Sequence, residues 1–467
     1  MADEDPAMKI STTVLSCVFV ALTLALSVFR FLDGDEVEHV HSTWYVLNGA
    51  LPYVDFFEHH HSLLWYCLAP LLMLTGQSAS ALIAFRLVFF ALTLATVRAT
   101  YLLALECGGS RAVAKLAVTL LLSMTTFVYV AIEIRPDVPQ VFFGVLSALY
   151  LVRLFRTRAH GHAVLAGVAA AFSFLFLQKA IFLLAAYPLL FMFHVVRRQL
   201  PWRTAVSFAV AFTLTCLPCF VYLSATGSLD DYLITNWFLN LDVGAGRAHV
   251  SFLSPVVVRD FARNALFWVL AIGAAATLFR RRFRDGYAVP ASLGFCVVCV
   301  IFALNRVVDR YLVAAVPFLA VAAAAWFTEN VGRFRLSGRQ AAAVLLCVCL
   351  VPGVAMVRSV GRSNAGQLAQ IQYVLDHSRA NDRMFDEWRD FNLFRPDVHY
   401  FWFLIRPGVK PYSRLSGGRF ADFDLCREIA AAKPRFVSNR RADLERCGLL
   451  NQYRPTAFAY LSVRADR

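Results

Sequence analysis

The stretch DGDEVEHVHSTWYVLNGALPYVDFFEHHH, residues 33–61, decides the fold of this chain. It follows the first strongly apolar segment and carries six carboxylates and five histidines but no Lys or Arg, although the net charge of the protein is +14. Apolar residues recur in its first half at steps of three and four, at Val37, Val40, Trp44, Leu47 and Leu51. This period predicts a helix with one apolar stripe, and Asp35, Glu38 and Ser42 fall on its opposite side. We expect the helix to lie along a membrane surface, with the stripe in lipid and the acids toward water or a cavity.

Composition places the chain among polytopic membrane proteins. Hydrophobic residues make up 59% and charged residues 16% of its 467 residues, and the mean hydropathy is +0.59. Soluble domains are about half apolar and a quarter charged. The N-terminus MADEDPAMK lacks the features of a removable signal peptide, so we expect the apolar run 10–32 to remain as the first helix. Most of the eleven cysteines lie in apolar runs, where they behave as small hydrophobes.

Apolar runs long enough to cross a bilayer occur throughout the first three quarters of the chain. They lie at 10–32, 80–104, 112–131, 138–155, 161–177, 180–196, 203–224, 262–279, 287–304, 309–328 and 340–357. A shorter run, 62–76, contains Pro70 and has the length of a re-entrant or interfacial helix.

The placement of Arg and Lys decides between the topologies. If 62–76 does not span, every basic loop falls on one side of the membrane, and the positive-inside rule makes that side cytoplasmic. These loops contain Arg111 and Lys115; Arg153, Arg156 and Arg158; Arg197, Arg198 and Arg203; Arg280 to Arg282 with Arg284; and Arg333, Arg335 and Arg339. We therefore predict an all-α membrane domain of eleven transmembrane helices, with the N-terminus inside and the C-terminus outside.

This topology brings the unusual polar segments to the external face. They are 33–79, Glu133 to Asp137 (EIRPD), Gln178-Lys179, 225–261, Asn305 to Tyr311 (NRVVDRY) and everything after 358. Ionisable residues at membrane ends are costly and by default indicate function.

Structural roles compete with functional ones at several of these positions. Asp33 and Glu36 have the spacing of a capping box, which would explain Asp33 without catalysis and leave Glu36 with either role. Three adjacent histidines cannot all bind one ion, and an extended backbone would align only His59 and His61.

The remaining candidates also have structural alternatives. Arg135 and Asp137 could pair with each other at a helix start beside Pro136. Arg310 and Tyr311 could anchor a helix at the membrane interface. Lys179 could mark a hairpin, although it would still place a positive charge at the depth of lipid phosphates.

Several motifs recur in a fixed order along the membrane region. They are DE at 35–36, then NG-x-LPY-x-D, then EHHHSLLWY, RPD after the third span, QK between the fifth and sixth spans, and RYLVAAVP at the tenth. This order resembles the protein-mannosyltransferase clan (glycosyltransferase family 39), which includes bacterial lipid A aminoarabinose transferases. The resemblance implies a GT-C fold and an integral-membrane glycosyltransferase that uses a polyprenyl-phosphate sugar donor on the external face.

The resemblance also implies site residues. The first acidic motif is catalytic in the clan and maps to Asp35 and Glu36, while the second acid maps to Asp137. Glu58 matches a glutamate that helps to bind a metal in the aminoarabinose transferases, but His59 to His61 replace the lysine and prolines that follow it there.

The chemistry of sugar transfer assigns roles to these side chains. A carboxylate must accept the proton of the acceptor hydroxyl, and Asp35 is the best candidate for this base. Cations or a metal must stabilise the departing phosphate. We expect the donor phosphate to bind Arg135, Lys179, Arg310, Tyr311 and His59, and Glu58 and His61 to bind a divalent metal if one is needed.

The sequence changes character near residue 358, where charge density rises. We therefore predict a membrane domain over 1–357 and a small external α/β domain over 358–467. Helices are expected in GQLAQIQYVLDH and LCREIAAAK, and strands in FDEW, HYFWFL, RFVSN and TAFAYLSVR. Cys426 and Cys447, the two cysteines after 358, would form a disulfide if this side is oxidising.

Two other functions compete with glycosyl transfer. A transporter or flippase of lipid-linked sugars should show internal repeats and charged or broken helices at mid-membrane depth, which the sequence lacks. A catalytically inactive scaffold of the same fold is the third alternative. The basic residues are explained by topology, and no nucleic-acid-binding motif occurs. The expected partners are the polyprenyl-phosphate donor, membrane lipids and a lipid, glycan or protein acceptor, at a bacterial inner membrane with the active site facing the periplasm.

Overall fold

The computed structural model describes residues 5–465 apart from 247–254, 281–285, 304–308 and 439–440. The chain forms two compact units, and each unit contains several separate segments. The first consists of 1–30, 86–218 and 249–362, and the second of 31–85, 219–248 and 363–467. The second unit therefore joins the first acidic stretch to the C-terminal segment.

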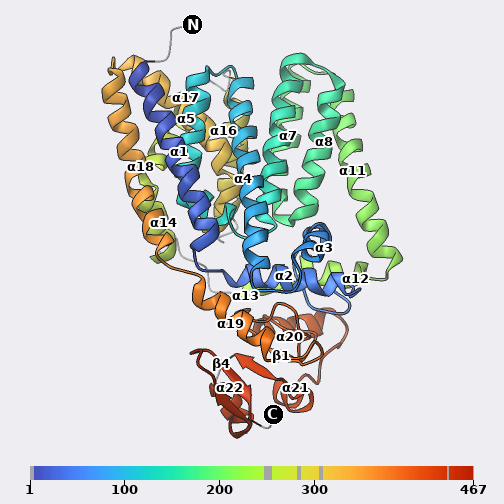
Figure 1. Ribbon diagram of the computed structural model, residues 1–467. Helices are drawn as coiled ribbons and strands as arrows, with labels where there is room; N and C mark the ends of the chain where they lie inside the picture. Colours follow the sequence, from blue (N-terminus) through green and yellow to red (C-terminus); the bar gives the residue numbers. More distant parts are fainter. Residues whose placement is uncertain (1–4, 247–254, 281–285, 304–308, 439–440, 466–467) are drawn as a thin grey trace. The chain divides into compact units, whose positions relative to one another are not determined.

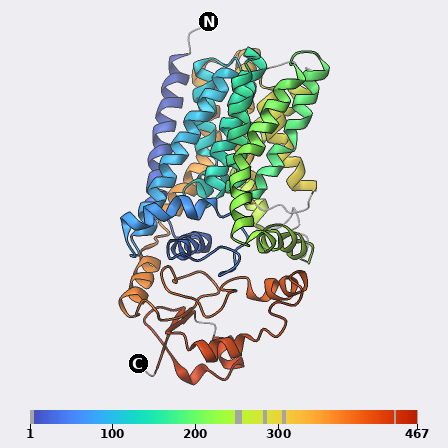
Figure 2. The same ribbon diagram turned by 90° about the vertical axis from the view of Figure 1, so that its right-hand side faces the viewer.

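The first unit is a bundle of long helices (Figures 1 and 2). Its elements are α1 (Pro6–Phe29), α4 (Ala81–Glu106), α5 (Arg111–Ser123), α6 (Thr125–Ala131), α7 (Asp137–Thr157), α8 (His160–Phe176), η1 (Gln178–Ala180), α9 (Ile181–Leu184), α10 (Ala186–Val196), α11 (Trp202–Ala225), α14 (Pro255–Arg263), α15 (Ala265–Arg280), α16 (Ala288–Ala303), η3 (Asp309–Ala314), α17 (Val316–Arg333) and α18 (Gly338–Val360). The unit boundaries fall within α4 and near the end of α11.

The protein crosses the membrane several times. Among the described residues, six helical segments are long and apolar enough to span, or seven if the bent pair α5–α6 forms one span. Helices α8, α15 and α16 are apolar but shorter. Helices occupy all the runs that were predicted to span. The number of membrane crossings and the side on which each loop lies stay predictions. Arg281, Arg282, Arg284 and the residues 305–308 of the predicted polar segments lie outside the described residues.

Close helix packing holds the first unit together. Apolar side chains from different helices, among them Leu120, Val145, Val316 and Leu345, are almost fully buried in one core. Gly167 of α8 sits so close to α11 that an added Cβ would lie 2.4 Å from the carbonyl oxygen of Phe208. Small residues at such crossings let helices approach in a membrane, where packing drives their association.

The second unit contains short helices and a small sheet. Its helical elements are α2 (Gly34–Leu47), α3 (Leu63–Thr75), α12 (Leu229–Leu233), the π turn η2 (Ile234–Phe238), α13 (Leu239–Gly246), α19 (Ala365–Asp376), α20 (Ile405–Leu415), α21 (Leu425–Ala432), α22 (Arg441–Arg446) and η4 (Leu450–Gln452). Helix α3 has 13 residues, a length of about 20 Å that is too short for a hydrocarbon core of about 30 Å.

The strands of the described C-terminal segment form one mixed sheet of four in the order β1-β2-β4-β3. They are β1 (Met384–Phe385), β2 (Phe436–Ser438), β3 (Tyr453–Pro455) and β4 (Leu461–Arg464). Strand β1 pairs with β2 in parallel, and β4 runs antiparallel to both β2 and β3.

Most predicted elements of this segment are present, with one clear error. Helix α21 and the strands β2 and β4 fall within their predicted stretches, α19 begins one residue before its stretch, and β1 overlaps FDEW only at Phe385. The elements α20, α22 and β3 were not predicted. The predicted strand HYFWFL, residues 399–404, is wrong, because this run forms no strand and leads directly into α20. Its aromatic side chains instead pack around Phe57, whose N–H and C=O bond the Tyr400 carbonyl and the Trp402 indole N–H.

The predicted disulfide between Cys426 and Cys447 is present. The two residues have Cα atoms 5.1 Å apart and join the start of α21 to the end of α22. A disulfide in this segment agrees with an oxidising compartment.

Candidate functional site

The N-terminus of α2 fixes the position of the predicted base. Asp33 is the N-cap, and its Oδ1 accepts a hydrogen bond from the Asp35 N–H at 3.2 Å. Glu36 completes the capping box by accepting from the Asp33 N–H at 2.9 Å. The structural role expected for Asp33 is therefore confirmed, and Glu36 shares it. Asp35 lies in the first turn, with its side chain 19% exposed.

Arg389, which the sequence did not single out, contacts this turn from the far end of the chain. One guanidinium nitrogen donates to Asp35 Oδ1 at 2.7 Å and also bonds Glu38 Oε2. Burial alone would lower the pKa of Arg389, but the charges of Glu38 and Asp35 outweigh burial and raise it. A cation from the C-terminal segment therefore balances the acids of α2.

The loop that carries Arg389 is held by a buried carboxylate. The Asp386 oxygens accept hydrogen bonds from the backbone N–H groups of Asp390, Phe391 and Asn392 at 2.8 to 3.1 Å. Arg389 itself adopts the left-handed conformation with φ +61°. The carboxylate thus shapes a tight turn that presents the guanidinium.

A second contact joins α2 to the C-terminal segment. His41 Nε2 lies 2.7 Å from Asp397 Oδ2, and its Nδ1 lies 3.0 Å from the carbonyl oxygen of Leu393. The Tyr45 hydroxyl donates to the same Asp397 oxygen at 2.9 Å. These bonds fix the register of α2 against the loop after β1.

The polar side of α2 is not open to water, which corrects the expectation for Glu38 and Ser42. Both residues are fully buried, and the Ser42 hydroxyl donates to Glu58 Oε2 at 3.0 Å. The apolar stripe is buried in the protein as well, with Val37 2%, Val40 0% and Trp44 9% exposed, so burial does not distinguish the two sides of α2. The amphipathic pattern could not reveal that Glu58 and Arg389, both distant along the chain, cover the polar side.

Glu38 and Glu58 form a buried cluster with two histidines. His60 Nδ1 lies 3.2 Å from Glu38 Oε1 and 3.1 Å from Glu58 Oε1, so an Nδ1–H can donate to both carboxylates. His59 Nδ1 lies 3.4 Å from Glu58 Oε1. The histidine rings are 4.1 Å apart between their centroids.

The electrostatics of the cluster distinguish its members. Burial and the charge of Glu58 raise the pKa of Glu38 to about 7. Burial would also raise the pKa of Glu58, but hydrogen bonds from His59 and His60 hold it well below its usual value. Burial lowers the pKa of His59 to about 4, while the two carboxylates overcome burial at His60 and raise its pKa to about 9. Perturbed groups of this kind concentrate at functional sites.

The donor set fits a divalent metal ion. Among the described residues, Glu38, Glu58, His59 and His60 can each offer one ligand atom, and these atoms lie within 4.8 Å of one another. Carboxylate and imidazole ligands suit Zn²⁺ and related ions. Binding through His60 Nδ1 would displace its proton. The structure thus places the predicted Glu58 in the candidate set.

His61 lies in a different environment from the other two histidines. Its Nε2 is 3.0 Å from the hydroxyl of Tyr232, a residue of α12. The structure therefore brings His59 together with His60 rather than with His61, because this segment is not an extended strand.

The first unit holds a separate cluster of charges. Arg135 Nε lies 3.3 Å from Asp137 Oδ2, as the pairing alternative predicted, and Lys179 Nζ lies 3.8 Å from Asp137 Oδ1. The Lys179 ammonium also lies 4.2 Å from the ring centroid of Tyr311. Four predicted residues from α7, η1, η3 and the turn before α7 thus meet, with Asp137 almost fully buried.

Arg30 and Glu133 extend this cluster. The Arg30 guanidinium donates to Glu133 Oε1 at 2.8 Å, and Glu133 Oε2 lies 3.8 Å from Arg135 Nη1. Arg310 is half-buried in η3, next to Tyr311. Arg30 was missed, although an arginine at the end of an apolar run was a usable signal. Sequence analysis placed Glu38 on the polar side of the helix but did not assign it to the site. No local sequence pattern indicated Arg389.

Sequence comparison supports the resemblance drawn from the motifs. Residues 75–232 match the family described as dolichyl-phosphate-mannose-protein mannosyltransferase. This part of the chain is therefore similar to the protein-mannosyltransferase family. This segment includes Arg135, Asp137 and Lys179 but begins after Asp35 and Glu58. No curated protein sequence matches the chain.

Solved structures extend the likeness to nearly the whole fold. ArnT from Cupriavidus metallidurans bound to undecaprenyl phosphate is 12% identical with a TM-score of 0.69, over 97% of each chain. The Archaeoglobus fulgidus oligosaccharyltransferase in complex with Zn and sulfate is 14% identical with a TM-score of 0.61, over 95% of this chain and 71% of the other. AglB from the same organism, in complex with an inhibitory peptide and a dolichol-phosphate, has a TM-score of 0.53 at 14% identity, over 92% and 69%. The mannosyltransferase-like chain therefore has an ArnT-like fold.

Proposed function

We propose that this protein is an integral-membrane glycosyltransferase that transfers a sugar from a polyprenyl-phosphate donor to a lipid, glycan or protein acceptor. The observation that carries the proposal is the presentation of Asp35. Its carboxylate is partly exposed on the first turn of α2, beside a buried acid and histidine cluster, in an ArnT-like fold.

Asp35 acts as the general base. It accepts the proton of the acceptor hydroxyl as the oxygen forms a bond to the anomeric carbon of the sugar. The bond from that carbon to the donor phosphate breaks, and the polyprenyl phosphate leaves with the electron pair. Arg389 holds the Asp35 carboxylate in place at 2.7 Å, and an ionised carboxylate is the form that can accept a proton.

The cations of the first unit suit the donor phosphate. In the structure Arg135 and Lys179 both pair with Asp137, and the Lys179 ammonium also makes a cation–π contact with the ring of Tyr311. A phosphate oxygen can take the place of the carboxylate contact on Lys179, while Arg135 can bind two oxygens. Asp137 would then position both cations, and Arg310 stays a further candidate for phosphate contact. His59, whose pKa burial lowers to about 4, would serve as a metal ligand instead.

Glu38, Glu58, His59 and His60 would hold a divalent metal ion. Such an ion supplies positive charge that stabilises phosphate oxygens. The four side chains are buried or half-buried and their ligand atoms already converge. His61 is the weaker candidate, since it bonds Tyr232.

The proposed setting is a bacterial inner membrane, with eleven spans, the N-terminus inside and the acidic segment and C-terminal domain in the periplasm. The Cys426–Cys447 disulfide supports an oxidising compartment for the C-terminal domain.

A transfer assay with purified protein tests the proposal. The protein is incubated in lipid nanodiscs with a panel of polyprenyl-phosphate sugars and an envelope extract, and glycolipids and glycoproteins are analysed by mass spectrometry. A sugar-modified product that depends on Asp35 is expected. Movement of the donor across proteoliposomes without any product would instead identify a flippase, and neither product nor movement with intact donor binding would identify an inactive scaffold.

A further inference from the structure

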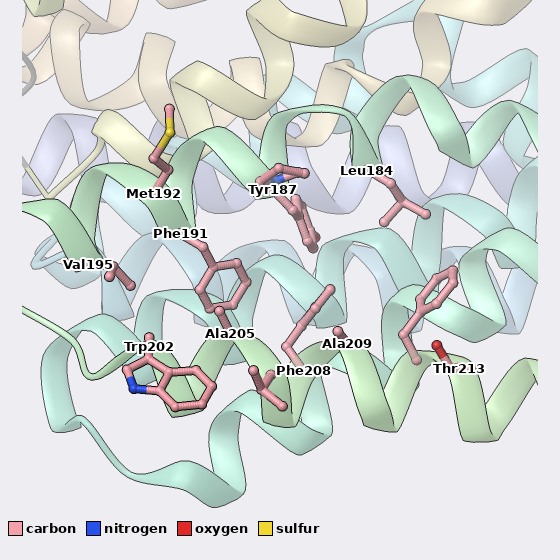
Figure 3. A pocket seen from close by; sticks show the side chains of 13 residues that line it. Leu184, Tyr187, Phe191, Met192, Val195, Trp202, Ala205, Phe208, Ala209 and Thr213 are labelled. Atoms are coloured by element: carbon pink, nitrogen blue, oxygen red, sulfur yellow. The ribbon is translucent and has the colours of Figure 1, made fainter.

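Helices α9, α10 and α11 of the first unit enclose an apolar groove (Figure 3). It measures about 600 Å³, which lies within the range of small-molecule sites. Its walls are almost entirely apolar, and the Tyr187 hydroxyl is used in a 2.9 Å hydrogen bond to Ser147. Small side chains, Ala205 and Ala209, form part of the α11 wall and leave the space unfilled (Figure 3).

The groove is open on one side. Met192 is 58%, Trp202 63% and Val206 45% exposed, although all three line it. The segments Gln178–Val196 and Trp202–Ala225 that form its walls are both long and apolar enough to span a membrane. A bilayer therefore supplies the molecules that reach the open side.

One end of the groove is strongly basic. Val195 and Trp202 line it, and the turn between them carries the exposed residues Arg197 and Arg198, with exposed Arg203 directly after Trp202. The chain has no Asp or Glu between Asp137 and Asp230. The Arg197 guanidinium lies 4.4 Å from the Phe193 ring centroid, and Arg198 and Arg203 are the other two exposed cations at this end.

This basic end is distinct from the cation cluster assigned to the donor phosphate. Lys179 lies at the start of the segment Gln178–Val196, whereas Arg198 follows its end. A helical segment of this length extends about 28 Å. A ligand whose headgroup meets Arg198 is therefore not held by Lys179.

We propose that the groove binds an anionic phospholipid of the bilayer, with an acyl chain between α10 and α11 and the phosphate at Arg198 and Arg203. The apolar walls match the chain, and the arginines match the headgroup. Basic residues at a membrane surface attract anionic lipid, and pockets between helices bind such headgroups. The bound lipid completes the packing of α10 against α11, where the alanines alone leave a gap.

Native mass spectrometry tests this proposal on the full-length protein. The protein in detergent is titrated with phosphatidylglycerol, with phosphatidylcholine of the same acyl chains, and with undecaprenyl phosphate. We expect one phosphatidylglycerol to be retained at energies that strip phosphatidylcholine. Arg198→Ala/Arg203→Ala should weaken this retention about tenfold or more. Arg333→Ala/Arg335→Ala, in another basic turn that also contains a left-handed arginine, is the matched control and should retain the lipid.

Filling the groove gives a second, independent readout. Ala209→Phe should abolish retention and also remove the rise in thermal stability that phosphatidylglycerol produces in the unaltered protein. If this variant does not fold, the arginine variants still decide the question. Equal retention of both phospholipids, equal loss in the control variant, or preferential retention of undecaprenyl phosphate that Arg198→Ala/Arg203→Ala abolishes would each overturn the proposal.

Discussion

The carboxylate of Asp35 accepts a 2.7 Å hydrogen bond from the guanidinium of Arg389, a residue 354 positions later in the chain. The same guanidinium bonds Glu38, which lies one turn further along α2. The C-terminal segment therefore provides the positive charge that the acidic stretch 33–61 lacks.

Replacing Asp35 by Asn should abolish transfer while the protein still folds and binds the donor. Asn keeps the size of the side chain but cannot act as a base, so we expect the rate to fall by roughly 10²- to 10⁴-fold. Asp33→Asn is the matched control, since Asn caps helices about as well as Asp. A donor-supplied assay that finds Asp33→Asn the less active of the two would refute the assignment.

Arg389→Ala should destabilise the second unit and impair transfer. It leaves buried Glu38 with His60 but without the guanidinium. We expect a loss of about 2 to 3 kcal/mol in the free energy of unfolding, below the range for fully buried pairs because Arg389 is 24% exposed. Arg427→Ala, an exposed control in α21, should change stability by less than about 0.5 kcal/mol. Equal thermal unfolding of the two variants would contradict this role.

The positions of the three histidines predict which of them the protein needs to bind a metal ion. Purified protein should contain a divalent metal by elemental analysis, and Glu58→Gln or His60→Ala should remove it. His61→Ala should retain the metal, because His61 bonds Tyr232 instead. Metal lost in His61→Ala but kept in His60→Ala would show that the ligand set is wrong.

Asp386 should make the second unit less stable as pH rises. Burial and the neighbouring charge of Asp390 raise its pKa to about 7, well above about 4 in the unfolded chain. The stabilising effect is complete below the unfolded value and is lost as the pH rises through about 7. Asp386→Asn should therefore weaken the pH dependence, so that the fall in melting temperature from pH 4 to pH 8 is smaller in the variant than in wild type. Exposed Asp422→Asn serves as control, and parallel pH profiles for wild type and Asp386→Asn would refute the prediction.

Reporter fusions test the sidedness. A periplasm-active reporter at the C-terminus should be active, and one placed after Arg198 should be inactive, because positive charge retains loops in the cytoplasm. Labelling of introduced cysteines at 76–80 from outside should agree. A cytoplasmic C-terminus would overturn the eleven-span topology.

Local patterns predicted the helices well because apolar runs and capping residues act over a few positions. The capping box of Asp33 and Glu36, the positions of the apolar helices and the helices α19 and α21 follow from such patterns. The order of the motifs also predicted the ArnT-like fold.

Tertiary contacts decided the rest. The run at 399–404 lacks the alternation of apolar and polar residues that marks a half-buried strand. Contact with Phe57, which is 342 to 347 positions away, fixes its aromatic residues instead. The choice between His60 and His61 as a metal ligand depends on the bend of the backbone at His60 and on the contact of His61 with Tyr232. Arg389 could not be predicted from the sequence around it. It is one of 45 basic residues, and nothing in its neighbourhood indicates that it pairs with Asp35 and Glu38.

The long separation between α2 and its cation also sets an order of events during synthesis. At about 5 to 20 residues per second, the ribosome makes Arg389 about 20 to 70 seconds after Asp35. Until then the emerging α2 contains the acids Asp35 and Glu38 without the guanidinium that contacts them, and a chain that ends before Arg389 never obtains it. The acidic stretch can therefore obtain this cation only after the ribosome has entered the last quarter of the chain, where Arg389 lies.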